Sequence, residues 1–501
     1  MTLLPQTSAV TASWARPVAA FFVLLLASTF FASYNSDTAY SSDEVWSVTA
    51  SSPDYRTVLT TLKADVHPPL YFLFLHEWIS WVGTGERTVR SLSGLFYLLT
   101  IFSVYQLGKR LTDQSTALMS AAIYMCSPLA ILSAQFARMY ALLALLTVLS
   151  SWLYLQFQPK SSDSTLLFVA YVVINVMGTF THVAFFFVLF GQGAFQIFFF
   201  QSEKLKRFLL AGIVSVIPYA VFWAPVLLRQ ISKSEEGLAW LKKPGLPQVS
   251  ELLFLYGGAF WLLVPLIAFI CWKYFYRLPS FKSQVMRAQL PLTLLACAVI
   301  IPILLSQFKP IFNPRFAIIG LPVFALSVGA FTPKLANYLL SAALILFTVV
   351  GFAISHEKSG SCDNRVIASY LNEVVHEGDV ILFTSLTRMP IDYYLKQISV
   401  GKDVIESSFP KDIDKHPGYE GNFRDPKRQL ELETEADQLL AGLLRTKTNN
   451  SEQRIFVFRG LHPEIDQFIE RRLARNFGKL TGQGRQCLGS STYFTDIVVY
   501  K

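Results

Sequence analysis

Long apolar runs recur along most of the chain, and they constrain its fold more than any other feature. Runs of about 18–22 apolar residues, the length that spans a bilayer core, occur between Arg16 and Ile354. The 501 residues are 52% hydrophobic and only 15% charged, whereas a soluble protein of this length carries more charge. We therefore predict a polytopic α-helical membrane domain in contact with membrane lipids.

The apolar runs predict about eleven transmembrane helices. In chain order they are 17–34, 88–108, 115–133, 139–157, 164–181, 183–200, 208–228, 252–272, 289–306, 316–331 and 335–354. Residues 68–83 are apolar but short for a span, and their tryptophans favour a helix at the membrane surface. Before them, Tyr55, Val58, Leu59 and Leu62 follow helical spacing and predict an amphipathic surface helix.

Short basic connections follow alternate predicted spans. They are Lys109-Arg110, Lys160, Lys204 to Arg207, Lys273 to Arg287, and Lys334. If residues 68–83 do not cross, the positive-inside rule places these connections in the cytoplasm. The N-terminus is then cytoplasmic and the C-terminal part extracytoplasmic. The net charge of +9 forms no basic stripe, so we expect no nucleic-acid partner.

After His356 the composition becomes that of an ordinary globular protein, which predicts two domains. Residues 1–355 form the membrane domain, with 35–67 as its first outer loop, and residues 356–501 form a soluble α/β domain. Its expected elements are helices at 365–375, 391–398 and 463–477 and strands at 379–383, 454–460 and 491–500. Residues 406–450 are polar and rich in turn formers, and 411–427 are predicted to be a long loop.

Two of the five cysteines, Cys362 and Cys487, lie in this C-terminal domain. Two interpretations are open for them: a disulfide, which requires an oxidising compartment, or two free thiols. The other three lie in apolar runs and are expected to be small buried side chains.

Charged and histidine side chains cluster at one end of the predicted spans. By the predicted topology the following residues all reach the outer face: Asp43, Glu44, His67, Arg138, His182 and Arg315. Charge beside a membrane is costly, so this gathering indicates a site rather than scattered surface charge.

The acidic pair directly follows the first span. A carboxylate there can act as a general base toward an acceptor hydroxyl, whereas the alternative is a solvated surface pair. His67 precedes two prolines that preset a helix start, where the helix dipole favours an anion. It can donate to a phosphate, ligate a metal together with Asp43 or Glu44, or simply cap the helix.

Arg138, His182 and Arg315 each stand beside an apolar helix. An interfacial arginine often extends to lipid headgroups, but an arginine is also the side chain best suited to bind phosphate. Both interpretations are open for each residue taken alone, and their shared face favours a site.

These residues belong to an ordered series of motifs. The series is Asp43-Glu44, His67 to Leu70, Arg90 to Leu95, Ser133 to Tyr140, Thr181-His182, and Pro310 to Phe316. In order and spacing the chain resembles the glycosyltransferase family 39-like enzymes of the GT-C superfamily. Relatives in that superfamily include the protein O-mannosyltransferases and the lipid A aminoarabinose transferases.

The resemblance implies a multi-pass enzyme of the inner (plasma) membrane, a hexosyl- or pentosyltransferase with a polyprenyl-phosphate-linked sugar as donor. The acceptor would be a lipid, a glycan or a protein, glycosylated on the outer face with inversion. Asp43 is carried over as the base, with Glu44 beside it. The outer-face arginines and histidines, together with Tyr140, would bind the substrate.

The one cofactor that the resemblance raises is a divalent metal ion, which some relatives bind near this site. Its candidate ligands here are Glu44, His67 and His182. Two other function classes stay open: a lipid-linked-sugar transporter or flippase, and a non-catalytic partner in envelope assembly. A transporter should show polar residues at the bilayer midplane and paired broken helices, which the sequence does not indicate.

Overall fold

The computed structural model shows two compact units. It describes residues 23–63, 67–157, 164–199, 205–233, 241, 243–274, 281–334, 336–355, 363–384, 387–398, 404–411, 426–449, 453–460, 463–480 and 496–501. The helical unit comprises Met1–Asp37, Ser51–Leu228 and Lys243–Gly351. The α/β unit comprises Thr38–Ala50, Arg229–Lys242 and Phe352–Lys501. The segment that carries Asp43 and Glu44 groups with the α/β unit. The predicted division into residues 1–355 and 356–501 stays a prediction.

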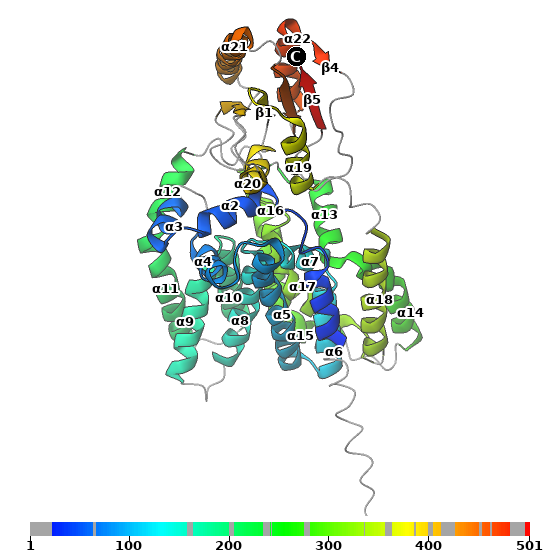
Figure 1. The fold of residues 1–501 in the computed structure, drawn as a ribbon. Helices are drawn as coiled ribbons and strands as arrows, with labels where there is room; N and C mark the ends of the chain where they lie inside the picture. The colour runs from blue at the N-terminus through cyan, green and yellow to red at the C-terminus, as the bar shows by residue number, and fades with distance from the viewer. Residues whose placement is uncertain are drawn as a thin grey trace, which may run out of the picture. The chain divides into compact units, whose positions relative to one another are not determined.

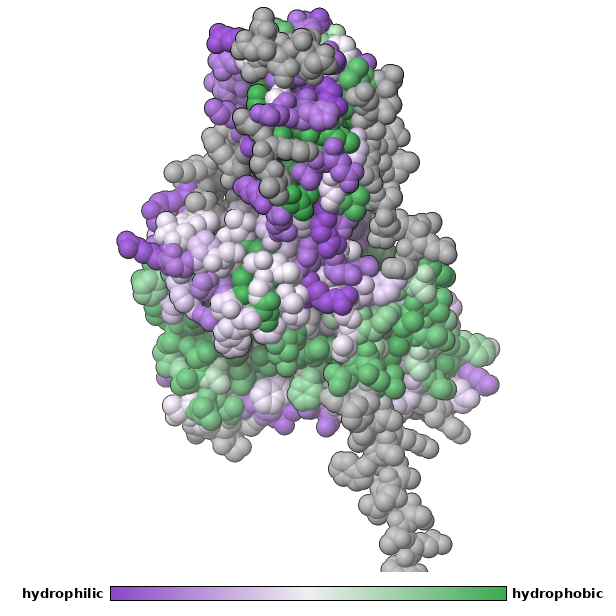
Figure 2. All heavy atoms as spheres, in the orientation of Figure 1, coloured by the Kyte–Doolittle hydropathy of each residue, from purple (hydrophilic) through white to green (hydrophobic). Residues whose placement is uncertain are grey.

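Apolar helices build the helical unit. Among the described residues, five helices are long and apolar enough to cross a membrane. They are α5 (Glu86–Leu111), α11 (Leu205–Phe222), Leu246–Lys273, Phe281–Leu305, and Asn337–Ile354 within α18. Figure 2 shows hydrophobic residues spread across the visible face of this unit. The predicted polytopic helical membrane fold is confirmed.

Five further apolar helices are shorter. They are Val23–Ser33, α8 (Tyr140–Phe157), α9 (Thr165–Thr179), α10 (Phe185–Phe199) and Phe316–Phe331. Figure 1 shows α5, α8, α9 and α11 running along a common direction. The total of about eleven crossings stays a prediction.

The remaining elements of this unit connect or complete these spans. They are α3 (Tyr55–Leu62), α4 (Leu70–Val82), α6 (Gln114–Met125), α7 (Pro128–Ala134), α12 (Ala224–Lys233), α13 (Leu246–Gly257), η2 (Gly258–Leu263), α14 (Val264–Lys273), α15 (Phe281–Leu295), η4 (Ala296–Ile300), α16 (Ile301–Leu305), η5 (Phe316–Gly320), α17 (Leu321–Phe331) and α18 (Asn337–Ser355).

The predicted span 115–133 is not one straight helix, because the structure breaks it into α6 and α7. The two helices meet at an angle of 64°. Pro128 opens α7. A proline has no N–H for the preceding turn, and its ring clashes with that turn's carbonyl, so it cannot continue α6 but suits the first position of a new helix.

The predicted amphipathic helix is present as α3. The Asp54 carboxylate caps its N-terminus by accepting hydrogen bonds from the backbone amides of Arg56 and Thr57. Val58 and Leu62 are buried, whereas Tyr55 and Leu59 face outward. The next helix, α4, has 13 residues and is too short to span a bilayer, as predicted for residues 68–83.

Polar side chains join α8, α9 and α10 inside the bundle. Ser150 donates to the Asn175 side-chain oxygen (2.6 Å) and accepts from the Gln192 amide (2.9 Å), while Tyr171 donates to Gln192 (2.5 Å). In an apolar interior such bonds satisfy polar groups that have no water to contact. They fix the three helices against one another, and with them the turns at their ends.

A five-stranded sheet forms the centre of the α/β unit. Its strands are β1 (Val380–Thr384), β2 (Ile405–Phe409), β3 (Ile455–Arg459), β4 (Lys479–Leu480) and β5 (Asp496–Tyr500). The order is β2-β1-β3-β5-β4; β1 lies parallel to β2 and β3, and β5 is antiparallel to β3 and β4. The predicted α/β character of this domain is confirmed.

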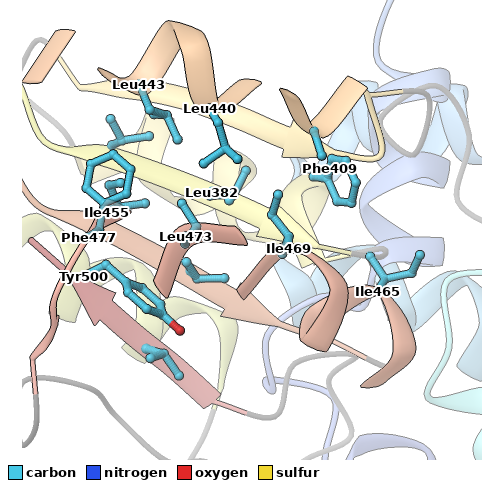
Figure 3. Packing of buried hydrophobic residues seen from close by; sticks show 14 of the residues in the cluster. Leu382, Phe409, Leu440, Leu443, Ile455, Ile465, Ile469, Leu473, Phe477 and Tyr500 are labelled. Atoms are coloured by element: carbon cyan, nitrogen blue, oxygen red, sulfur yellow. The ribbon is translucent and has the colours of Figure 1, made fainter. Parts of the chain in front are cut away.

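Within the described part of the C-terminal sequence, four helices accompany the sheet. They are α19 (Asn364–Val374), α20 (Arg388–Ile398), α21 (Pro426–Asn449) and α22 (Pro463–Asn476). In Figure 3 the side chains of α21 and α22 pack with Leu382 and Ile455 of the sheet, in a core that continues to Phe409 and Tyr500. Helices α19 and α20 pack together, and the Arg388 guanidinium of α20 lies 5.8 Å from the centre of the Phe383 ring of β1.

The prediction that residues 406–450 are turn-rich is wrong over much of its length. They include most of β2 and all of α21, a helix of 24 residues. Leu432, Ala436, Leu440 and Leu443 of α21 are buried. Their helical spacing was hidden by the many charged residues between them, because a helix on a small domain exposes most of its surface.

The structure describes three of the five cysteines. Cys362 and Cys487 lie outside the described residues. Cys126, Cys271 and Cys297 are free thiols; Cys126 and Cys297 are buried, as expected, and Cys271 is partly exposed.

Candidate functional site

The predicted site residues fall into two groups. One group is in the helical unit and consists of His67, Arg138, Tyr140, His182 and Arg315; we call it the basic cluster. The acidic pair Asp43-Glu44 lies on α2 (Ser42–Ser51) and groups with the α/β unit. Each group is therefore described by itself.

The basic cluster begins with the turn that carries His67. The backbone amide of Leu70, at the start of α4, donates to the carbonyl of Phe180 at the end of α9 (3.0 Å). This bond ties the His-Pro-Pro turn to the turn between α9 and α10. As a result the His67 and His182 rings lie 6.4 Å apart, centre to centre.

Arg138 joins these histidines from a third turn, between α7 and α8. Its side chain is buried, and its Nη2 donates to Nε2 of His67 (3.1 Å). A guanidinium has only donors, so Nε2 of His67 must be the accepting nitrogen. His67 is therefore a neutral imidazole with its proton on Nδ1.

His182 is buried and also neutral. Its Nδ1 accepts from the backbone amide of Ala184 (3.0 Å), which leaves the proton on Nε2 as a donor. Burial, with added repulsion from the Arg138 guanidinium, lowers the pKa of His182 from 6.5 to about 3. The ring therefore stays an uncharged hydrogen-bond donor throughout the physiological pH range.

Aromatic side chains connect Arg315 to the rest of the cluster. The Arg315 guanidinium lies 5.6 Å from the centre of the Phe136 ring, a cation–π distance. Phe136 and Tyr140 are parallel rings 6.3 Å apart, and Phe316 lies 6.5 Å from Tyr140 and 4.9 Å from His182. Phe136 and Phe316 lie within two of the predicted motifs, but neither was predicted as a site residue.

The chemistry of the basic cluster suits an anion. Two arginines supply fixed positive charge, and two neutral histidines supply N–H donors. Such donors recognise phosphate oxygens through charge-assisted hydrogen bonds. A divalent cation fits this cluster poorly, because Arg138 already uses the Nε2 lone pair of His67 and repels positive charge. Within the described ranges, no group of three or more His, Cys, Asp or Glu side chains could hold a metal ion.

The acidic pair stands at the start of α2. Ser41 precedes this helix, and its amide and hydroxyl both donate to Oε2 of Glu44 (3.0 and 3.1 Å). The carbonyl of Ser41 in turn accepts from the amides of Glu44 and Val45. Glu44 is buried and occupies the acidic position of a capping box, whereas Asp43 is only partly buried. The two acids thus have different surroundings. The spacing Ser-x-x-Glu of a capping box fits Ser41 and Glu44, and it leaves Asp43 outside that pattern.

Arg90, which belongs to the third motif of the series, connects two segments of the helical unit. Its side chain is buried, and Nη1 donates to the carbonyl of Ser36 (3.0 Å), just after the first helix. It therefore holds the end of that helix against α5.

Part of the helical unit is similar to a known protein family. A family model described as dolichyl-phosphate-mannose-protein mannosyltransferase matches residues 66–227. The match includes four residues of the basic cluster, His67, Arg138, Tyr140 and His182, and leaves out Arg315 and the acidic pair. No curated protein matches the chain.

Solved structures match nearly the whole length. ArnT from Cupriavidus metallidurans in the apo state has a TM-score of 0.59 at 12% identity, over 98% of both chains. The same protein bound to undecaprenyl phosphate has a TM-score of 0.55, also at 12% identity and 98% of both chains. The fold is of the GT-C type.

A third GT-C match comes from an archaeon. The oligosaccharyltransferase of Archaeoglobus fulgidus, in complex with Zn and sulfate, has a TM-score of 0.50 at 13% identity. The alignment covers 88% of this chain and 68% of the archaeal one. The predicted resemblance to GT-C membrane glycosyltransferases is confirmed at the level of the fold.

Proposed function

We propose that the chain transfers a sugar from a polyprenyl-phosphate donor to an acceptor hydroxyl on the extracytoplasmic face of the cell membrane. The observation that carries this proposal is the basic cluster. Four turns that are far apart in the sequence bring His67, Arg138, His182 and Arg315 together. We infer that their ligand is the donor's phosphate group.

The electrostatics of the cluster favour a phosphate that gains charge during the reaction. Arg138 is buried, so its attraction for an anion is screened less than that of a surface arginine. His182 adds a neutral donor that does not compete for protons with the leaving group. When the bond between sugar and phosphate breaks, the phosphate oxygen gains negative charge. Donors already in position stabilise that charge without rearranging.

Asp43 is the proposed general base, an assignment that rests on the family resemblance. Its carboxylate takes the proton of the acceptor hydroxyl, and the oxygen forms a bond to the anomeric carbon of the sugar. The bond from that carbon to the phosphate oxygen breaks on the opposite side. Polyprenyl phosphate leaves with the bonding electrons, and the configuration of the sugar inverts.

Glu44 receives a different role in this proposal. Its carboxylate accepts two hydrogen bonds from Ser41 and closes the first turn of α2. We infer that it orients Asp43 and takes no proton itself. The acceptor is the hydroxyl of a lipid, a glycan or a protein, and no step of the proposed reaction depends on a metal ion.

The direct test is Asp43→Asn, with Asp54→Asn as the matched control. Both exchanges replace a carboxylate by an amide, and Asn at position 54 still caps α3 because it is as good an N-cap as Asp. A strain that lacks the gene is complemented with each variant, and its lipid-linked sugars are measured by mass spectrometry.

Asp43→Asn should leave the lipid-linked donor to accumulate, with transfer reduced on the order of 10²- to 10⁴-fold. Asp54→Asn should restore normal levels. Undiminished transfer by Asp43→Asn would falsify the assignment of the base. A deletion strain without any accumulated lipid-linked sugar would contradict the enzyme itself and favour a transporter or an assembly role.

A further inference from the structure

The backbone just before the acidic pair is held by side chains that come more than 300 residues later. The amide of Tyr40 donates to the hydroxyl of Tyr394 (2.7 Å), and the carbonyl of Tyr40 accepts from the side-chain amide of Asn364 (2.8 Å). Both polar groups of one peptide residue are thus bonded to the α/β unit. All three residues belong to that unit, as do Asp43 and Glu44.

Tyr40 is completely enclosed by other residues. Its side chain is 0% exposed, and its ring meets the Tyr393 ring edge to face at 5.8 Å. Asn364 and Tyr394 are also buried. Hydrogen bonds in such a place have no water to replace a lost partner, so removing one leaves a buried donor or acceptor unsatisfied.

A third hydrogen bond holds Ala39, the residue before Tyr40. The amide of Ala39 donates to Oδ2 of Asp363 (3.0 Å), the residue that also caps α19 and pairs with Arg365. Burial raises the pKa of the Asp363 carboxyl, but hydrogen bonds from Arg365 and Ala39 lower it more, so the pKa lies below its ordinary value of 3.8. This acceptor therefore stays charged at any working pH.

These three hydrogen bonds lie directly before the start of α2. Ser41, which follows Tyr40, receives the side chain of Glu44, and Asp43 lies in the first turn. A fixed peptide at Tyr40 therefore determines where the helix begins and in which direction its first turn points.

We propose that the C-terminal α/β unit is a positioning device for the acidic pair, with Tyr394 and Asn364 as positioning residues. This inference rests on the proposed function, since it assigns the unit a role in that reaction. Catalytic groups must be held close to their productive geometry, and a misplacement of about 1 Å costs on the order of 10²-fold in rate. The α/β unit is then part of the catalytic machinery and not an accessory domain.

The test compares two buried tyrosine hydroxyls of the same unit. Tyr394→Phe removes the acceptor of the Tyr40 amide, and Asn364→Leu removes the donor to its carbonyl. Tyr500→Phe is the matched control, because its hydroxyl donates to Glu470 (2.8 Å) and has no bond to residues 38–50. Transfer is measured in the complemented deletion strain, and binding of undecaprenyl phosphate is measured on the purified full-length protein.

Tyr394→Phe and Asn364→Leu should lower transfer by roughly 10- to 100-fold while binding of undecaprenyl phosphate is unchanged. Hydrogen exchange should become faster in residues 39–47 and stay unchanged in β1 and β3. Tyr500→Phe should keep its transfer. Full transfer by Tyr394→Phe, or an equal loss in Tyr500→Phe, would overturn the proposal.

Two further results keep this test separate from that of the proposed function. If Asp43→Asn transfers normally, the reaction mechanism fails, whatever Tyr394→Phe does. If Asp43→Asn is inactive but Tyr394→Phe is fully active, only the positioning role fails. In the unmodified protein, the amides of residues 39–47 should exchange as slowly as those of α19. Fast exchange there would contradict the proposed fixing of this segment, even if the variants do not fold.

Discussion

The basic cluster and the acidic helix are built in different ways. The cluster consists of turns between apolar helices, and each turn is fixed by the helices on either side of it. The acidic helix α2 has only ten residues and obtains its fixed position from Asp363, Asn364 and Tyr394. One region is rigid because of the membrane bundle, and the other because of a domain that follows it.

This difference separates two tasks of the proposed reaction. A phosphate site needs charge of one sign at nearly fixed positions, which helix ends can supply. A general base must meet an acceptor that enters and leaves, so its support comes from a separate unit. Mutations in the two regions should therefore have distinguishable effects: loss of donor binding in one, and loss of turnover with normal binding in the other.

Apart from Asp43→Asn, the largest effect should come from Arg138→Ala. Removal of a buried donor to a developing charge typically costs on the order of 10²- to 10³-fold in turnover, and here binding of undecaprenyl phosphate should weaken as well. Arg138→Lys should not restore either property, because a lysine cannot reproduce the planar fork that reaches His67. Binding and transfer are measured on the purified protein and in the complemented strain.

Arg87→Ala is the matched control for that prediction. Arg87 pairs with Asp37 at 3.4 Å, but its side chain is 68% exposed, and exposed ion pairs contribute little. Normal binding of undecaprenyl phosphate by Arg138→Ala would contradict the assignment of the basic cluster to phosphate.

A smaller effect should separate the two acids of α2. Glu44→Gln keeps the capping box, because a glutamine at this position also accepts from the amide of Ser41. Glu44→Ala loses it, at a cost of about 1 kcal/mol in helix stability, which lowers the ratio of folded to unfolded helix roughly fivefold. We therefore expect near-normal transfer for Glu44→Gln, a modest loss for Glu44→Ala, and normal phosphate binding for both.

The decisive comparison is between Glu44→Gln and Asp43→Asn in the same transfer assay. If both are inactive, the negative charge of Glu44 takes part in the reaction, and its assignment as a cap is insufficient.

The sequence alone predicted which residues of the basic cluster come together. Each of its residues stands beside an apolar run, and the alternation of spans predicts which ends share a face. The break at Pro128 was also readable in principle, because a proline that opens a helix leaves a clear signal. The helix α21 was harder, since its apolar positions are separated by charged residues that a domain surface tolerates.

The support of the acidic helix was not predictable from sequence. Its hydrogen bonds join residues that are 324 and 354 positions apart. Tyrosine and asparagine are common in helices and turns, so neither Tyr394 nor Asn364 differs locally from a surface residue. Such contacts depend on how a loop meets a distant domain, and no spacing rule covers that.

The smallest expected effect concerns acid stability and should appear in only one of the two regions. The folded pKa of His182 is about 3, below the ordinary value of 6.5, so the unfolded chain binds more protons between these values. Its stabilising contribution is therefore complete above pH 6.5 and falls as the pH drops. Asp363 has its pKa lowered below 3.8 and therefore keeps its charge at pH 5.

At pH 5, amide protection should therefore decrease around residues 178–185 and persist in residues 39–47, as measured by hydrogen exchange corrected for intrinsic rates. His182→Asn should remove this pH dependence, because an asparagine oxygen can accept from Ala184 and does not titrate. The same exchange at His76, whose Nδ1 donates to the carbonyl of Ser51, should leave it in place. Equal loss of protection in both regions would mean that acid acts on the whole fold, and that the two regions are not supported independently.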